Sequence, residues 1–215
     1  MTMKTAAPSL SRDASLSIFS QTMGLVAITC LFTALGAYLG QGVQGMATLI
    51  PWIGVIACVI GLNAANRKEA YQLALTLLFA MGLLAGVAIG YTLHYMSVTD
   101  SSAIYQAAAA TGLFVAALGA GGYAIRRDLS YLYRFAFFAL LGLIVFGIDL
   151  IFAQIPGGQM IYSIFGLLVF GLYSVLDFNR LRRAGQDQVI PLAAGIFLTV
   201  LNVFMLFLRI FGSSR

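Results

Sequence analysis

Long apolar runs alternate with short polar segments along almost the whole chain. A helix that crosses a membrane needs about 20 predominantly apolar residues, and seven runs come close to that length or exceed it. They cover residues 18–40, 47–64, 70–94, 103–125, 131–154, 158–182 and 189–211. The second run is short and has Pro51 near its start, where a helix tolerates proline in its first turn. The pattern predicts an all-α polytopic membrane protein with seven transmembrane helices.

Residues 1–17 differ from the rest because they are polar and contain Ser, Thr and Pro. We expect a flexible cytoplasmic tail over 1–17 and a single seven-helix transmembrane domain over 18–215. The apolar run over 18–40 is too long for the core of a signal peptide, so it is predicted to be the first spanning helix.

Composition excludes a soluble fold. Hydrophobic residues make up 61% of the chain and charged residues 9%, whereas an ordinary soluble domain has about 25% charged residues. This number of charged residues is too small to cover a water-facing surface. The bilayer is therefore the expected solvent, and lipid is the expected partner.

Positive charge lies on one side of the predicted topology. The loops after the second, fourth and sixth spans are basic, and the three intervening loops contain no Lys or Arg. The basic loop residues are Arg67, Lys68, Arg126, Arg127, Arg180, Arg182 and Arg183. The positive-inside rule then predicts a cytoplasmic N-terminus and an external C-terminus. Arg209 and Arg215 fit an external end poorly, so a last helix that does not fully cross is an alternative.

Several function classes are disfavoured. The net charge of +5 does not indicate nucleic-acid binding, because the basic residues form short clusters between apolar runs, as in loops that face an anionic leaflet. Cys30 and Cys58 lie far apart in apolar runs, which is typical of buried structural thiols. His94 is the only histidine, so a multi-histidine metal site is excluded. HExxH, GxSxG and P-loop motifs are absent, so we expect neither an enzyme nor a bound cofactor.

Glycines at Gly82, Gly86 and Gly90 form two overlapping GxxxG steps on one face of the third span. Small residues let two helices approach closely. We expect this face to pack within the chain, with a dimer face as the alternative. The protein is accordingly expected to be a monomer or a weak homo-oligomer.

Two of the seven acidic residues, Asp149 and Asp177, fall inside predicted spans. A carboxylate at mid-depth costs about 3 kcal/mol on insertion scales and usually faces protein or water. At 1.5 Å per residue, the two differ in depth by roughly 20 Å, so they cannot share a proton. Asp149 belongs near the outer end and Asp177 near the cytoplasmic end. They are compatible with a cation route and with two unrelated structural acids.

Asp177 has candidate partners nearby. Arg180 lies three residues later on the same helical face, where an ion pair could plug a pore or only neutralise the acid. Thr199 and Asn202 share one face of the seventh span and could approach Asp177 if the last two helices pack together. Their alternative role is interhelical hydrogen bonding.

The segments YSIFGLLVFGLYSVLDFNRLRR and VIPLAAGIFLTVLNVFMLFLRIFG resemble the last two helices of the Bax-inhibitor-motif family, including its bacterial YccA-type members. RRDLSYLYRF resembles the family's element before its fifth helix. The resemblance implies that the last helix is central and wrapped by the other six. It also implies a pH-sensitive calcium leak gated by two aspartates.

Asp177 matches the first of those aspartates, although its flanking residues Phe178 and Asn179 depart from the family pattern. The second position falls at Thr199, which is not an acid. Two carboxylates in contact raise one pKa strongly because both cannot ionise together. Without the second acid, the paired pH sensor is incomplete.

The resemblance implies a multi-pass protein of the bacterial inner membrane. The first functional hypothesis is a calcium leak in which Asp177 contacts the transported ion. The alternative is a non-conducting regulatory protein that modulates a membrane-bound protease such as FtsH. A third hypothesis, a proton-coupled transporter, needs a protonatable group near mid-membrane, where neither aspartate is expected.

Overall fold

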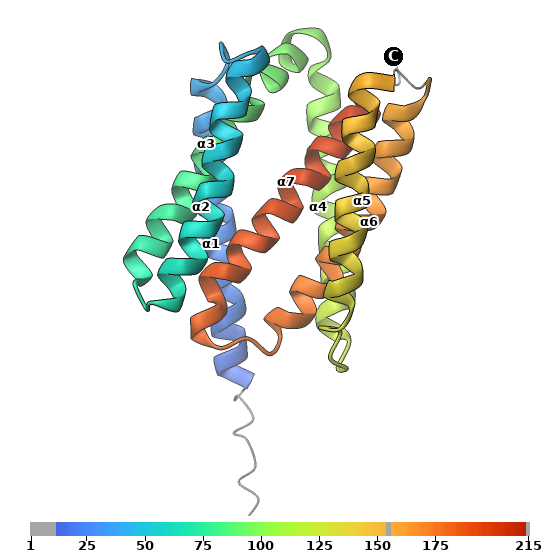
Figure 1. Ribbon diagram of the computed structural model, residues 1–215. Helices are drawn as coiled ribbons and strands as arrows, with labels where there is room; N and C mark the ends of the chain where they lie inside the picture. Colours follow the sequence, from blue (N-terminus) through green and yellow to red (C-terminus); the bar gives the residue numbers. More distant parts are fainter. Residues whose placement is uncertain (1–11, 154–155, 214–215) are drawn as a thin grey trace, which may run out of the picture.

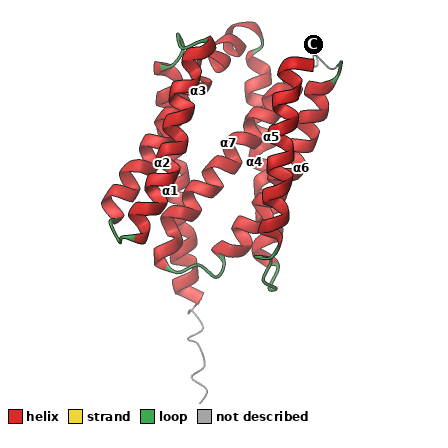
Figure 2. Cartoon of the chain, viewed as in Figure 1, coloured by secondary structure: helices red, strands yellow, loops and turns green. Residues whose placement is uncertain are grey.

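A computed structural model describes residues 12–153 and 156–213 (Figure 1). Within these ranges every regular element is helical (Figure 2). The long helices are α1 (Arg12–Leu39), α2 (Leu49–Arg67), α3 (Tyr71–Thr99), α4 (Ser101–Ala124), α5 (Leu132–Ala153), α6 (Gly158–Leu181) and α7 (Val189–Ser213). Two short 3₁₀ helices, η1 (Gly45–Thr48) and η2 (Gln186–Gln188), precede α2 and α7.

All seven long helices are long and apolar enough to cross a membrane. The prediction of seven spanning helices is therefore confirmed for the described residues. The helix α1 begins at Arg12, earlier than the predicted residue 18. The rest of the predicted tail, residues 1–11, and the predicted end of the fifth span at residue 154 lie outside the described residues.

The helices form two groups with α7 between them (Figure 1). In one group α1 and α2 pack against α3, and in the other α4 and α5 pack against α6. The helix α7 packs against α1, α4 and α6 and also touches α2 and α3. Enclosure of the last helix by all six others stays a prediction, because α5 packs chiefly on α6.

The two termini of the described bundle lie at opposite ends (Figure 1). The helix α7 extends over 25 residues, about 37 Å at 1.5 Å per residue, which is enough for a full crossing. This length favours the seven-span prediction over a last helix that stops part-way. We call the end where α1 begins the basic end, since the basic loops after α2, α4 and α6 lie there. The other is the far end.

The glycine face of α3 packs against α1. A Cβ atom at Gly86 would overlap the backbone oxygen of Thr33, and one at Gly82 would lie 2.7 Å from the oxygen of Thr29. The contact is reciprocal, because a Cβ at Gly36 of α1 would overlap the backbone of Leu83. The two backbones touch directly, so this face serves packing within the chain, as predicted.

Replacing Gly86 with alanine is expected to separate α1 from α3. Overpacking of this kind costs about 2 kcal/mol, so we expect a clear fall in the melting temperature of the detergent-solubilised protein, measured by circular dichroism. Gly121→Ala is the matched control, because a Cβ there meets nothing within 4 Å. Equal melting temperatures for the two variants would contradict the close α1–α3 contact.

Candidate functional site at the basic end

Asp177 lies between three helices near the end of α6. It is 7% exposed, and its two carboxylate oxygens have different partners. The Tyr133 hydroxyl, from α5, donates to Oδ1 at 2.8 Å. The Thr199 hydroxyl, from α7, donates to Oδ2 through a long bond of 3.4 Å. Gly195, one turn before Thr199, leaves room for the carboxylate, since a Cβ there would lie 3.7 Å from Oδ2. The site thus joins α5, α6 and α7.

A further buried hydroxyl lies on the same face of α6. Ser174 is three residues before Asp177, which places the two side chains on one helical face. Its Oγ is buried and has no hydrogen-bond partner within the described part of the chain. A buried polar atom without a partner is uncommon. The Ser174 hydroxyl on this face of α6 therefore remains available for a further hydrogen bond.

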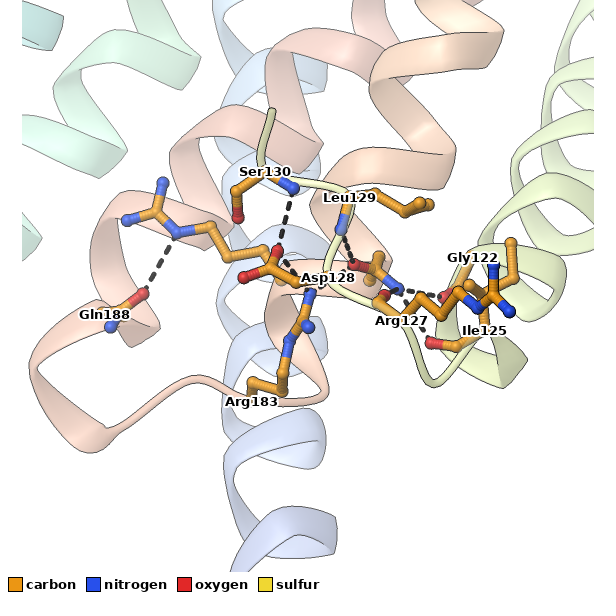
Figure 3. Close-up of polar contacts among 10 residues, drawn as sticks. Gly122, Ile125, Arg127, Asp128, Leu129, Ser130, Arg183 and Gln188 are labelled. Atoms are coloured by element: carbon orange, nitrogen blue, oxygen red, sulfur yellow. Dashed lines mark hydrogen bonds and ion pairs between the residues drawn. The ribbon is translucent and has the colours of Figure 1, made fainter. Parts of the chain in front are cut away.

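The structure separates the predicted site residues. Thr199 reaches Asp177, as the sequence suggested. Arg180 does not form an ion pair with it, because its Nε donates instead to Gln188 Oε1 at 3.1 Å (Figure 3). Asn202 donates to the carbonyl of Leu198 on its own helix.

Asp149 lies apart from this group. It is exposed near the far-end terminus of α5, as expected for an acid near the headgroup region. Since α5 leads from the basic end to the far end (Figure 1), the two intramembrane aspartates lie toward opposite ends of the bundle. The described residues hold no cluster of three His, Cys, Asp or Glu side chains, so any cation at Asp177 would meet a single carboxylate.

Asn179, two residues after Asp177, anchors the loop between α4 and α5. Its side-chain nitrogen donates to the carbonyls of Gly122, Ile125 and Arg127 at 3.2, 2.8 and 3.2 Å (Figure 3). Its two N–H groups therefore share three acceptors. Carbonyls at a helix C-terminus lack hydrogen-bond donors within the helix. Asn179 supplies such a donor at the C-terminal end of α4.

The oxygen of Asn179 completes the anchor. It accepts from the backbone N–H of Leu129 at 3.2 Å and from the Arg183 guanidinium. Arg183 also pairs with Asp128 at 3.0 Å, the one ion pair among the described residues. The loop from α4 to α5 is consequently bonded to the end of α6 directly beside Asp177.

Hydrogen bonds from Ser130 and the charge of Arg183 lower the pKa of Asp128 below its ordinary value of 3.8. A lowered pKa in the folded state means that the charged form is favoured by folding. The contribution of this pair is therefore present at neutral pH and is lost only as the pH falls below 3.8 and through the lowered pKa. The Asp128 side chain is 66% exposed, so the contribution is small.

Sequence reasoning missed Tyr133, Asn179 and the Asp128–Arg183 pair as site components. Tyr133 and Asp128 lie in the RRDLSYLYRF segment, whose resemblance to a family element was the available signal. The backbone partners of Asn179 lie 50 to 57 residues away, and spacing along one helix does not reveal contacts at that range.

Comparison with known proteins adds a family and relatives. A family model described as "Inhibitor of apoptosis-promoting Bax1" matches residues 16–215. An uncharacterized protein of Pseudomonas aeruginosa is 29% identical, over 91% of this chain and 88% of its own length. An uncharacterized protein of Helicobacter pylori is 27% identical, over 96% and 91%. An uncharacterized membrane protein of Vibrio cholerae is 25% identical, over 91% and 88%.

The Asn179→Leu substitution is expected to release the loop between α4 and α5. Each buried polar group that loses its partner costs about 1–3 kcal/mol, so we expect a lower melting temperature and faster tryptic cleavage after Arg126 and Arg127. Asn63→Leu is the control, because Asn63 is exposed on α2 and bonds only to Val59 of its own helix. The anchor assignment is wrong if both variants are cleaved at the wild-type rate.

Proposed function

The chain belongs to the Bax inhibitor family, and from that membership we propose that it forms a cation leak pathway, with calcium as the ion, closed at the basic end near Asp177. The proposal places the protein in the bacterial inner membrane with its N-terminus in the cytoplasm. The three relatives named above are bacterial, and the Vibrio cholerae protein is described as a membrane protein.

One observation carries the proposal: a buried carboxylate lies among spanning helices with no basic group paired to it. Asp177 bonds only to hydroxyls, those of Tyr133 and Thr199. An acid inside a membrane bundle that forms no ion pair is a candidate for a cation pathway. The nearest basic side chain on its helical face, Arg180, bonds to Gln188, and its charge acts on Asp177 without forming an ion pair.

The oxygens around Asp177 suit a weak cation site. Calcium takes six to eight oxygen ligands, and the described site offers one carboxylate with the hydroxyls of Tyr133, Thr199 and Ser174 nearby. Such a set would bind calcium poorly. Passage requires only sites that an ion can leave readily, so a poor site is consistent with a leak and inconsistent with calcium storage.

The closed state has a physical basis in the same contacts. Tyr133 and Thr199 occupy both carboxylate oxygens, and the Asn179 anchor fixes the adjoining loop. Opening requires these hydroxyls to turn away from Asp177. Because Thr199 stands where the resemblance implies a second aspartate, the carboxylate has no acidic neighbour on α7, and we expect its response to pH to be shallow.

A second candidate is a non-conducting regulator of a membrane protease such as FtsH. The observation in its favour is that the basic end is closed by an anchored loop and carries exposed cations, among them Arg67, Lys68, Arg126 and Arg127. Exposed basic loops suit a protein partner or an anionic membrane surface. The proton-coupled transporter is less favoured, because Asp177 lies toward one end of the bundle rather than at mid-depth.

Calcium flux into proteoliposomes tests the leak directly. We expect Asp177→Asn to reduce flux about tenfold or more, because loss of 1.4 kcal/mol of attraction is already a factor of ten. Asp149→Asn is the matched control and should leave flux within about twofold, since that carboxylate is exposed near the far end.

Two outcomes decide between the candidates. Flux that is equal in wild type and Asp177→Asn would exclude this carboxylate from the pathway. An absence of flux in both, together with co-purification of a membrane protease, would support the regulatory function instead.

Restoring the second acid tests the pH hypothesis. In a Thr199→Asp variant two carboxylates would face each other, and one pKa should rise because both cannot ionise together. We expect calcium flux to gain a steep dependence on pH between about 5 and 8 that the wild type lacks. Thr199→Asn, which adds no titratable group, is the control. A flat profile in Thr199→Asp would contradict the paired geometry.

A further inference from the structure

A long apolar groove lies between α1 and α4, on a different side of the bundle from the Asp177 site. It has a volume of about 1080 Å³, and α7 forms its floor through Phe197 and Phe204. The helix α1 packs on α3 and α7, whereas α4 packs on α6 and α7, so the space between α1 and α4 stays open.

The groove extends over most of the membrane thickness. On α4 its lining reaches from Ile104 to Ala124, about 30 Å at 1.5 Å per residue, which equals the thickness of a typical hydrocarbon core. A single acyl chain from one leaflet would fill about half of that length. The dimensions therefore fit a lipid that enters from one end.

The lining offers almost nothing to water. Two of its few polar side chains, Thr33 and Thr111, donate their hydroxyls to carbonyls of their own helices, those of Thr29 and Ala107. An apolar space without free polar partners does not hold ordered water. Within a bilayer, the material that can supply dispersion contacts to such walls is hydrocarbon.

The basic end of the groove carries unpaired positive charge. Arg126 and Arg127 follow the last lining residues, Tyr123 and Ala124; both are exposed, and neither side chain has a bond within the described part of the chain. Arg182 lies at the same end, where its Nη1 donates to the carbonyls of Tyr123 and Ala124 at 3.5 and 3.4 Å. The closest acid in sequence, Asp128, is already paired with Arg183.

We propose that this groove binds one acyl chain of an anionic phospholipid from the leaflet at the basic end, with the lipid phosphate at Arg126, Arg127 and Arg182. Guanidinium groups bind phosphate strongly through charge-assisted hydrogen bonds, and basic clusters beside spanning helices attract anionic lipids. The inference is independent of the ion pathway, because none of the groups that bond to Asp177 lines the groove.

Photolabelling tests the acyl-chain site. Full-length protein is reconstituted with a phospholipid that carries a diazirine on its acyl chain, irradiated, and mapped by peptide mass spectrometry. We expect more label on the groove faces of α1 and α4 than on the lipid-facing side of α5. Gly112→Phe should lower groove labelling at least fivefold, because Gly112 lines the groove and has open space around it.

Gly121→Phe is the matched control, since Gly121 lies on the same helix with equally open space but does not line the groove. Should Gly112→Phe fail to fold, the smaller change Ala116→Leu fills the same groove. Labels that spread evenly over α5, or groove labelling unchanged in a folded filling variant, would overturn the proposal. Cross-links to a second copy or to another protein would also overturn it, by assigning the groove a different occupant.

The headgroup is tested by comparing the same photolabel on phosphatidylglycerol and phosphatidylcholine. With wild type we expect at least threefold more groove labelling from the anionic lipid, and the double variant Arg126→Gln, Arg127→Gln should abolish that preference. The control is the double variant Arg67→Gln, Lys68→Gln, which removes two cations from another loop at the same end. It should leave the preference for the anionic lipid unchanged. An equal response to the two double variants would contradict a phosphate site at α4.

Discussion

The hydrogen bond from Tyr133 to Asp177 is the contact on which the candidate site depends, because it joins α5 to α6 where a carboxylate lies buried among spanning helices. Its geometry rests on a second set of bonds two residues along α6. Asn179 bonds to the backbone on both sides of the turn between α4 and α5, which fixes where α5 begins. That start places Tyr133, in the first turn of α5, within reach of the carboxylate. The position of Tyr133 beside Asp177 therefore depends on the hydrogen bonds of Asn179.

Length and apolarity predicted the spans because a bilayer imposes both on any helix that crosses it. They also predicted the approach of Thr199 to Asp177, since these residues lie 22 apart on two helices joined by a short loop. The direction of Arg180 was not predictable from the i, i+3 spacing. A side chain at the last turn of a helix can bond to the following loop as easily as to its own helix, and here Gln188 supplies the acceptor.

Burial was harder to predict than crossing, because an apolar side chain suits both lipid and protein core. The helix α5 exposes Phe135, Phe137 and Phe138, whereas α7 buries Phe197 and Val203, and hydrophobicity does not distinguish these environments. Glycine marked the interior where two backbones touch, as at Gly86 on α3. On α4 the two cases occur together, because a Cβ at Gly122 would overlap the backbone of Val175, whereas Gly112 faces open space. Small residues permit close packing but do not enforce it.

The groove and the carboxylate are neighbours on α6 without sharing a wall. Asp177 faces α5 and α7, whereas the next residue, Phe178, lines the groove and packs its ring against Gly119 of α4. Consecutive residues on a helix point about 100° apart, so one turn of α6 serves both features and keeps them separate. The helix α7 does the same on its own surface, with Thr199 toward the acid and Val200 toward the groove. A bundle with one helix between two groups can thus hold a polar site on one side and a hydrocarbon-lined groove on the other.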